Sequence, residues 1–165
     1  MAEQAFSQQG TRSTGMLIGL SMAMVVESVA VHALVAKRWP LADVVLIVVN
    51  VLTLVWLVRH WRAVGDRPLV VRESGLGIAH GTLVAVEVPW SQVRSVTRAA
   101  WRDLPTDARQ GFLKLSGGDD PSVLVACEPP VPVKMMGVPK QVSLFGLRPD
   151  DASGFVAAAA AHVGA

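Results

Sequence analysis

The stretch "GMLIGLSMAMVVESVAVHALVA" (residues 15–36) is followed after "KRWP" (37–40) by "LADVVLIVVNVLTLVWLV" (41–58). A helix that crosses the hydrocarbon core of a bilayer needs about 17–25 apolar residues, and each stretch meets that length. The proline of the connection ends the first helical pattern and opens the second. A connection this short predicts an antiparallel hairpin of two transmembrane helices over residues 15–62, preceded by an N-terminal tail over residues 1–14.

The composition agrees with a membrane protein. Only 17% of the 165 residues are charged, whereas ordinary soluble domains carry about 25%. The shortage is confined to the predicted hairpin. From residue 66 onward the composition is that of a soluble domain of common size, about 100 residues, so we expect a cytoplasmic domain over residues 66–165.

Several function classes lack support in the sequence. The net charge of +2 is too small to indicate a nucleic-acid partner, and the chain has no tyrosine for base stacking. The single cysteine excludes an internal disulfide and a cysteine-cluster metal site. No P-loop, dinucleotide-binding, nucleophile-elbow or zinc spacing is present. We therefore expect no cofactor, no metal site, no catalytic residues and no enzymatic activity.

A secretory signal peptide is the competing interpretation of residues 1–33, because Val31 and Ala33 resemble a cleavage site. Its apolar stretch is too long for a signal peptide, and a second span follows at once. Lys and Arg then predict the orientation. Two of them lie in the connection, against five on the opposite side, which places both termini in the cytoplasm. The five are Arg12, Arg59, Arg62, Arg67 and Arg72.

Glu27 lies near the middle of the first predicted span, where a charge costs about 2.5–3.5 kcal/mol or more. If the hairpin folds back at residues 38–39, Glu27 is level with Asn50, the only amide of the second span. His32 lies about 140° around the helix from Glu27, on a different face. Three interpretations follow. A neutral Glu27 bonds to Asn50 or Ser28, Glu27 or His32 pairs with another membrane subunit, or Glu27 and His32 relay protons.

The rest of the chain predicts antiparallel strands and a closing helix. "VVRESGLGIAHG" (70–81) has a β-hairpin pattern, and "LVAVEVPWSQVRSVTRA" (83–99) continues as strands bent at Pro89. "GFLKLSGGDDPSVLVAC" (111–127) predicts two strands around a tight turn. A strand over 141–147 precedes a helix over 150–163 that an Asp or Ser caps. The fold class is therefore α+β.

This order and wording resemble the bacterial pleckstrin-homology-like (PH-like) domain proteins with an N-terminal two-helix hairpin. The resemblance rests on "RESGLGIAHG" (72–81), "VPWSQVRSV" (88–96) and "VSLFGLRPDDASGFVAAA" (142–159). It implies a PH-like antiparallel barrel or sandwich with a C-terminal helix, in a multi-pass protein of the bacterial inner membrane. The function of that family is largely unknown, and the proline-rich "CEPPVPVKMMGVPK" (127–140) departs from its pattern.

Some further side chains are candidates for a lipid or partner surface. We expect Trp90, Val93 and Val96 to pack under the final helix through Phe155 and Val156. These residues are therefore assigned to the core and not to the candidate surface. A packed or docking loop is expected over residues 129–139. The candidates are Arg59 and Arg62 after the second span, Arg94 and Arg98 on one strand face, Trp101, Met135 and Met136.

The leading hypothesis is a non-enzymatic accessory or scaffold subunit that binds other integral membrane subunits. A second hypothesis is a module that binds anionic phospholipid headgroups, and a third is a proton or ion pathway through Glu27.

Overall fold

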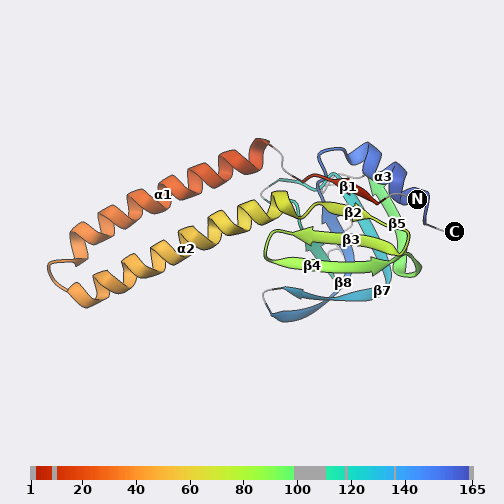
Figure 1. Cartoon of the computed structure of the whole chain (residues 1–165). Helices are drawn as coiled ribbons and strands as arrows, with labels where there is room; N and C mark the ends of the chain where they lie inside the picture. Colours follow the sequence, from red (N-terminus) through yellow and green to blue (C-terminus); the bar gives the residue numbers. More distant parts are fainter. Residues whose placement is uncertain (1–2, 9–10, 99–110, 118, 136, 164–165) are drawn as a thin grey trace.

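The computed structural model describes residues 3–8, 11–98, 111–117, 119–135 and 137–163. Two long helices form an antiparallel hairpin that extends from a β domain capped by a short helix (Figure 1). The helices are α1 (Thr11–Val35) and α2 (Pro40–Asp66). Both are long and apolar enough to cross a membrane. The α+β class and the two apolar helices are thus as the sequence predicts.

Helix α2 begins at Pro40. A proline is well tolerated at this position, because the first backbone N–H groups of any helix have no intrahelical partner and the missing N–H of proline therefore costs no hydrogen bond. The helix continues beyond the apolar stretch to Asp66, so Arg59 and Arg62 lie on its last turns rather than in a linker. The next strand along the chain begins only three residues later, at Leu69. Helix and domain are therefore joined without a long linker.

The first sheet has the strand order β1-β2-β3-β4, and every neighbouring pair is antiparallel. The predicted hairpin over 70–81 is present as β2 and β3. The N-terminal segment, which the sequence presented only as a tail, supplies an edge strand. The strands are β1 (Gln4–Phe6), β2 (Leu69–Val71), β3 (Gly75–His80) and β4 (Val84–Pro89).

The second sheet has the order β5-β7-β8-β6, and here one expectation is wrong. Residues 112–114 do not pair with the strand that follows the turn, because β8 lies between them. Instead β6 pairs with β8 in parallel, so the domain is not wholly antiparallel. A short 3-10 turn, η1 (Trp90–Gln92), leads into this sheet at the predicted bend. The strands are β5 (Val93–Arg98), β6 (Phe112–Lys114), β7 (Val123–Met135) and β8 (Val138–Leu147).

The proline-rich segment is also not a loop. It forms the distal halves of β7 and β8, which pair from Val131↔Val142 to Met135↔Val138. The ladder is interrupted between Ala126 and Val131. The adjacent prolines Pro129 and Pro130 lie in that interruption, where no ladder hydrogen bond requires a backbone N–H.

The inward faces of both sheets form one apolar core that α3 (Ala152–Ala160) closes. Phe145 and Phe155 are fully buried in it. Asp151 caps α3 by accepting a hydrogen bond from the Gly154 N–H at 2.8 Å. Trp90, Val93, Val96 and Val156 belong to the same cluster, so the predicted packing under the last helix is confirmed. Phe6 of β1 meets Phe155 edge to face, with ring centroids 5.3 Å apart.

Candidate functional site

The two long helices contact each other along a narrow stripe. Residues of α1 that are half-buried recur at alternating spacings of three and four, the seam of a left-handed helix pair. The faces of the two helices that point away from this stripe are mainly apolar and exposed. The stripe consists of Thr14, Leu17, Ser21, Met24, Ser28, Val31 and Val35.

Asn50 of α2 projects into this seam and donates a hydrogen bond to the Ser28 hydroxyl at 3.1 Å. The fold-back predicted from the connection is thus correct in depth. The amide bonds Ser28, however, and not Glu27. The sequence predicted Asn50 or Ser28 as the hydrogen-bond partner of Glu27, but these two side chains bond to each other.

Nearer the connection, His32 and Asp43 form a hydrogen-bonded pair that the sequence analysis missed. The His32 Nδ1 lies 2.9 Å from Oδ1 and 2.8 Å from Oδ2 of Asp43. The Asp43 side chain is only 9% exposed, whereas that of His32 is 53% exposed. A signal for this pair was present, because the fold-back that places residue 27 level with residue 50 places residue 32 within two residues of Asp43. His32 is therefore engaged inside the hairpin.

Unlike the polar side chains of these two pairs, Glu27 is not engaged within the hairpin. It is exposed on α1, and it has no hydrogen-bond or ion-pair partner among the residues that the structure describes. Glu27 and His32 flank the seam on opposite sides, so the carboxyl cannot join the His32–Asp43 pair. Of the three ionisable side chains inside the two apolar stretches, Glu27 alone is unpaired within the described chain.

The surroundings of Glu27 on the helix are small and apolar. Ala23 and Ala30 lie one turn away on either side, and both are exposed. Leu20 and Leu34 extend the same stripe and are 47% and 80% exposed. Small residues on either side of a polar side chain allow a second helix to approach closely. We call this surface, made of Leu20, Ala23, Glu27, Ala30 and Leu34, the Glu27 face.

The predicted basic candidates divide into paired and unpaired side chains. Arg94 donates to Glu128 at 2.7 Å, and Arg98 donates to the Ser153 hydroxyl at 3.0 Å. Arg59 and Arg62 are exposed and have no such partner within the described part of the chain. The cations that remain available are therefore those at the end of α2, not those on β5.

An open groove of about 500 Å³ crosses the outer face of the first sheet, over a floor that includes Ala79 and Ala85. Most of its charges neutralise one another. Arg72 donates to Glu87 at 3.0 Å and to Glu3 at 3.4 Å, and these bonds raise the pKa of the guanidinium. Because these charges pair with one another, the groove does not have the character of an anion-binding site.

Two of the four histidines of the chain come together where α2 meets the sheet. The rings of His60 and His80 are 5.8 Å apart, and Trp56 stacks on His60 at 5.3 Å. Burial and the neighbouring His60 lower the pKa of His80 to about 4. Gly81 adopts φ +53°, and a Cβ there would collide with the His60 ring, so the junction depends on this glycine.

Other candidate residues have structural surroundings or lie outside the described residues. Trp90 stacks on His162 at 5.0 Å and donates its Nε1–H to the Arg72 carbonyl at 2.8 Å. Burial raises the pKa of the Cys127 thiol to about 11, as suits a buried apolar side chain. Trp101 and Met136 are not among the described residues. Within the described ranges, no three His, Cys, Asp or Glu side chains are grouped as a metal site would require.

The chain thus combines an apolar two-helix hairpin with a two-sheet α+β domain. Comparisons with protein-family models, with curated proteins and with solved structures find no match to it. Its own geometry must therefore suggest its function.

Proposed function

We propose that this protein is a non-enzymatic accessory or scaffold subunit of a larger membrane complex. In this proposal α1 and α2 span the bacterial cytoplasmic membrane with both termini in the cytoplasm. The β domain is a cytoplasmic PH-like domain, as the motifs at 72–81, 88–96 and 142–159 suggest. The partners are other integral membrane subunits.

The unpaired Glu27 carries the proposal. Hydrocarbon offers no hydrogen-bond partner, so a carboxyl that faces lipid is strongly disfavoured even when it is neutral. Its neighbour Ser28 is satisfied by Asn50, and Asp43 is satisfied by His32. Thr53 donates to the Val49 carbonyl of its own helix at 2.8 Å. A helix of another subunit, with a donor or cation at this depth, would satisfy Glu27 through the Glu27 face.

The two alternative functions have less support. A lipid-headgroup module read by Arg94 and Arg98 would have to break the ion pair with Glu128 and the hydrogen bond with Ser153. A proton pathway through Glu27 and His32 would have to connect two side chains on opposite sides of the helix seam. In that case Glu27→Gln should abolish ion flux in proteoliposomes and leave assembly intact.

Co-purification tests the proposal. The full chain is extracted from its own membranes in mild detergent and compared with Glu27→Ala and with Thr53→Ala, a control that removes a polar group already satisfied within its helix. An intramembrane hydrogen bond contributes about 0.6–1.7 kcal/mol, so Glu27→Ala should reduce the associated subunit by about three- to twentyfold, and Thr53→Ala should not.

A photo-crosslinking residue locates the contact. At Ala30 it should trap the partner, whereas at Leu52, which is 63% exposed on α2, it should trap mainly lipid. Migration of the wild-type chain as an isolated monomer, with no crosslink at Ala30, would overturn the proposal.

A further inference from the structure

The distal halves of β7 and β8 form an arm that extends from the body of the domain. The last paired residues are Met135 and Val138, and Gly137 turns the chain between them with φ +84°. In Figure 1 the tip of this arm lies on the side of the domain from which α2 departs. The arm and the helical hairpin therefore extend from the domain toward the same side.

The tip exposes a large apolar side chain, unlike the rest of the described β domain. Val138 is 65% exposed, and it is the one large hydrophobic side chain that the structure describes as exposed outside residues 11–66. Its neighbour Pro139 is also exposed. Every other large apolar side chain described in the β domain is at least half-buried, so the exposure of Val138 is not typical of this surface.

One unpaired cation accompanies this tip. Lys134 is exposed and has no ion-pair or hydrogen-bond partner among the described residues. By contrast, Lys114 lies 3.9 Å from Asp120, and Lys140 donates to the Phe112 carbonyl at 3.0 Å. Because Lys134 pairs with Pro139 and Met135 pairs with Val138, the tip presents a free positive charge beside Pro139 on one face and Val138 on the other face.

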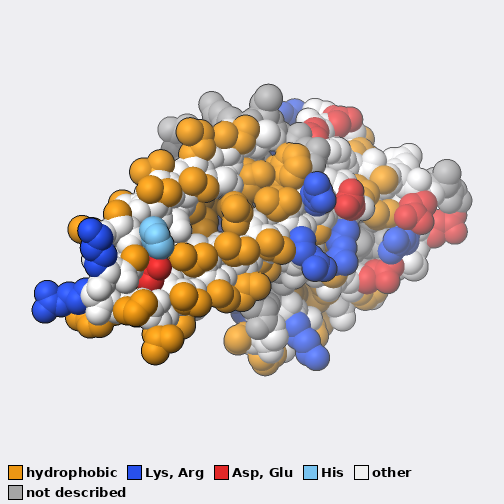
Figure 2. All heavy atoms as spheres, turned by 60° about the vertical axis from the view of Figure 1, so that its left-hand side comes forward, with side chains coloured by type: hydrophobic (Ala, Val, Ile, Leu, Met, Phe, Trp, Pro, Cys, Tyr) orange, Lys and Arg blue, Asp and Glu red, His pale blue; other side chains and the backbone are white. Residues whose placement is uncertain are grey.

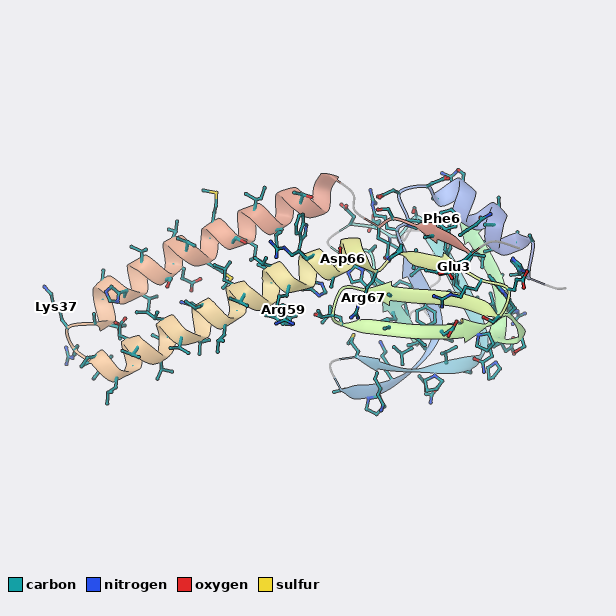
Figure 3. The ribbon with its side chains drawn as sticks, viewed as in Figure 1. Glu3, Phe6, Lys37, Arg59, Asp66 and Arg67 are labelled. Carbon is teal, nitrogen blue, oxygen red and sulfur yellow. The ribbon has the colours of Figure 1, made fainter. Side chains whose placement is uncertain are left out.

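The end of α2 presents the same chemistry at the junction. Arg59, Arg62 and Arg67 are exposed and lack partners among the described residues. Figure 2 shows basic side chains at the junction and at the tip of the helical hairpin, with an apolar band between them. In Figure 3, Arg59 and Arg67 lie at the domain end of α2, and Lys37 lies at the opposite end of the hairpin.

We propose that the tip of the β7–β8 arm, through Val138 and Lys134, contacts the surface of the same bilayer that α1 and α2 cross, and that it favours anionic phospholipid. Val138 would leave water for the headgroup region, and Lys134 would be attracted by the negative surface potential of the cytoplasmic leaflet. Together with the arginines of α2, the arm would fix the tilt of the β domain over the membrane. This inference rests on the membrane insertion in the proposed function.

Site-directed spin labelling of the full chain tests the contact. Single cysteines are placed at Val138, at Val48 on α2 and at the exposed Ala157 on α3, in a Cys127→Ala background. The labelled chains are reconstituted into nanodiscs of phosphatidylcholine with or without phosphatidylglycerol. Accessibility to oxygen and to a nickel chelate then reports the depth of each label.

We expect the Val48 label in hydrocarbon, the Ala157 label in water, and the Val138 label shifted to the interface when phosphatidylglycerol is present. A Val138 label as aqueous as the Ala157 label, with the Val48 label in lipid, would overturn this inference alone. A Val48 label in water would overturn both the inference and the membrane insertion. Shielding of the Val138 label from both reagents in every lipid would indicate a protein contact and also overturn it.

A charge variant provides the second readout. Since one basic residue near an anionic surface contributes about fivefold in partitioning, Lys134→Gln should reduce about fivefold the ratio of interfacial to aqueous Val138 label at a fixed phosphatidylglycerol fraction. The control Lys114→Gln removes a lysine that faces Asp120 and should leave that ratio unchanged. Equal behaviour of the two variants would contradict the role of Lys134.

Discussion

The helical hairpin and the β domain use the same apolar residue types in opposite ways. Val123 and Val125 in β7 are fully buried, whereas Val48 and Val51 in α2 are 50% and 54% exposed. No more than 6% of either candidate membrane span is buried within the protein. The domain removes its valines from water by folding. The hairpin can do so only by means of lipid or other subunits.

The polar side chains follow the same division. In the β domain, arginines are matched by acids or hydroxyls, as Arg94 is by Glu128. In the hairpin, Glu27 and the arginines of the last turns of α2 have no partners among the described residues. The exposed valines and unpaired charges of the hairpin therefore have no explanation within the described chain, and the proposed membrane and partner contacts would supply one.

The most direct test of this difference between the two regions is the same substitution, valine to alanine, in each of them. Val123→Ala should destabilise the β domain by about 2–3 kcal/mol, since it removes buried methyl groups and leaves a cavity. Val48→Ala should change stability by less than about 0.5 kcal/mol, because lipid replaces lipid around the shortened side chain. Pulse proteolysis of the full chain in urea, in detergent, measures both. Equal losses would show that the α2 face is packed against protein.

A second prediction concerns the junction of the two regions. The pKa of His80 lies near 4 in the folded chain and near 6.5 in an unfolded chain, so the unfolded state binds more protons between these values. Stability is therefore full above pH 6.5 and falls as the pH decreases toward 4. We expect a loss of about 2 kcal/mol between pH 7 and pH 5, measured by the same proteolysis.

The matched variant for this prediction is His80→Gln, which keeps a polar side chain but does not titrate. Its stability should lose most of that pH dependence. An unchanged pH slope would mean that His80 is not the group responsible.

The smallest expected effect concerns the seam within the hairpin. Asn50→Ala removes the hydrogen bond to Ser28, and polar contacts between helices in membranes contribute about 0.6 kcal/mol on average. Steric trapping of the two helices in bicelles can resolve a change of that size. A loss several times larger would indicate that Asn50 also satisfies a group outside the hairpin, such as a partner subunit.

The sequence predicted those features that depend on local patterns. Two long apolar stretches and a four-residue connection determined the helical hairpin and its register to within two residues. Asp151 as a helix cap and Pro89 as a bend were also correct, because caps and bends depend on the residue itself and its immediate neighbours.

The errors lie where distant segments choose between partners. Residues 112–114 looked like the first half of a hairpin, yet they pair in parallel with residues 144–146. A strand of three residues has little preference of its own, so the sheet that remains available decides its pairing. The partner of Asn50 was missed for a related reason. Depth in a hairpin follows from counting residues, but the choice between Glu27 and Ser28 depends on the rotation of the helix.

What the sequence determined by itself is the division of the chain into an apolar hairpin and a compact α+β domain, because hydrophobicity and chain connectivity are local properties. Only the tertiary structure decided which polar groups are satisfied. It paired His32 with Asp43, Ser28 with Asn50 and Arg94 with Glu128, and it left Glu27 and Lys134 without partners among the described residues. A hydrogen bond requires two groups to meet at about 3 Å, and no local pattern specifies that distance.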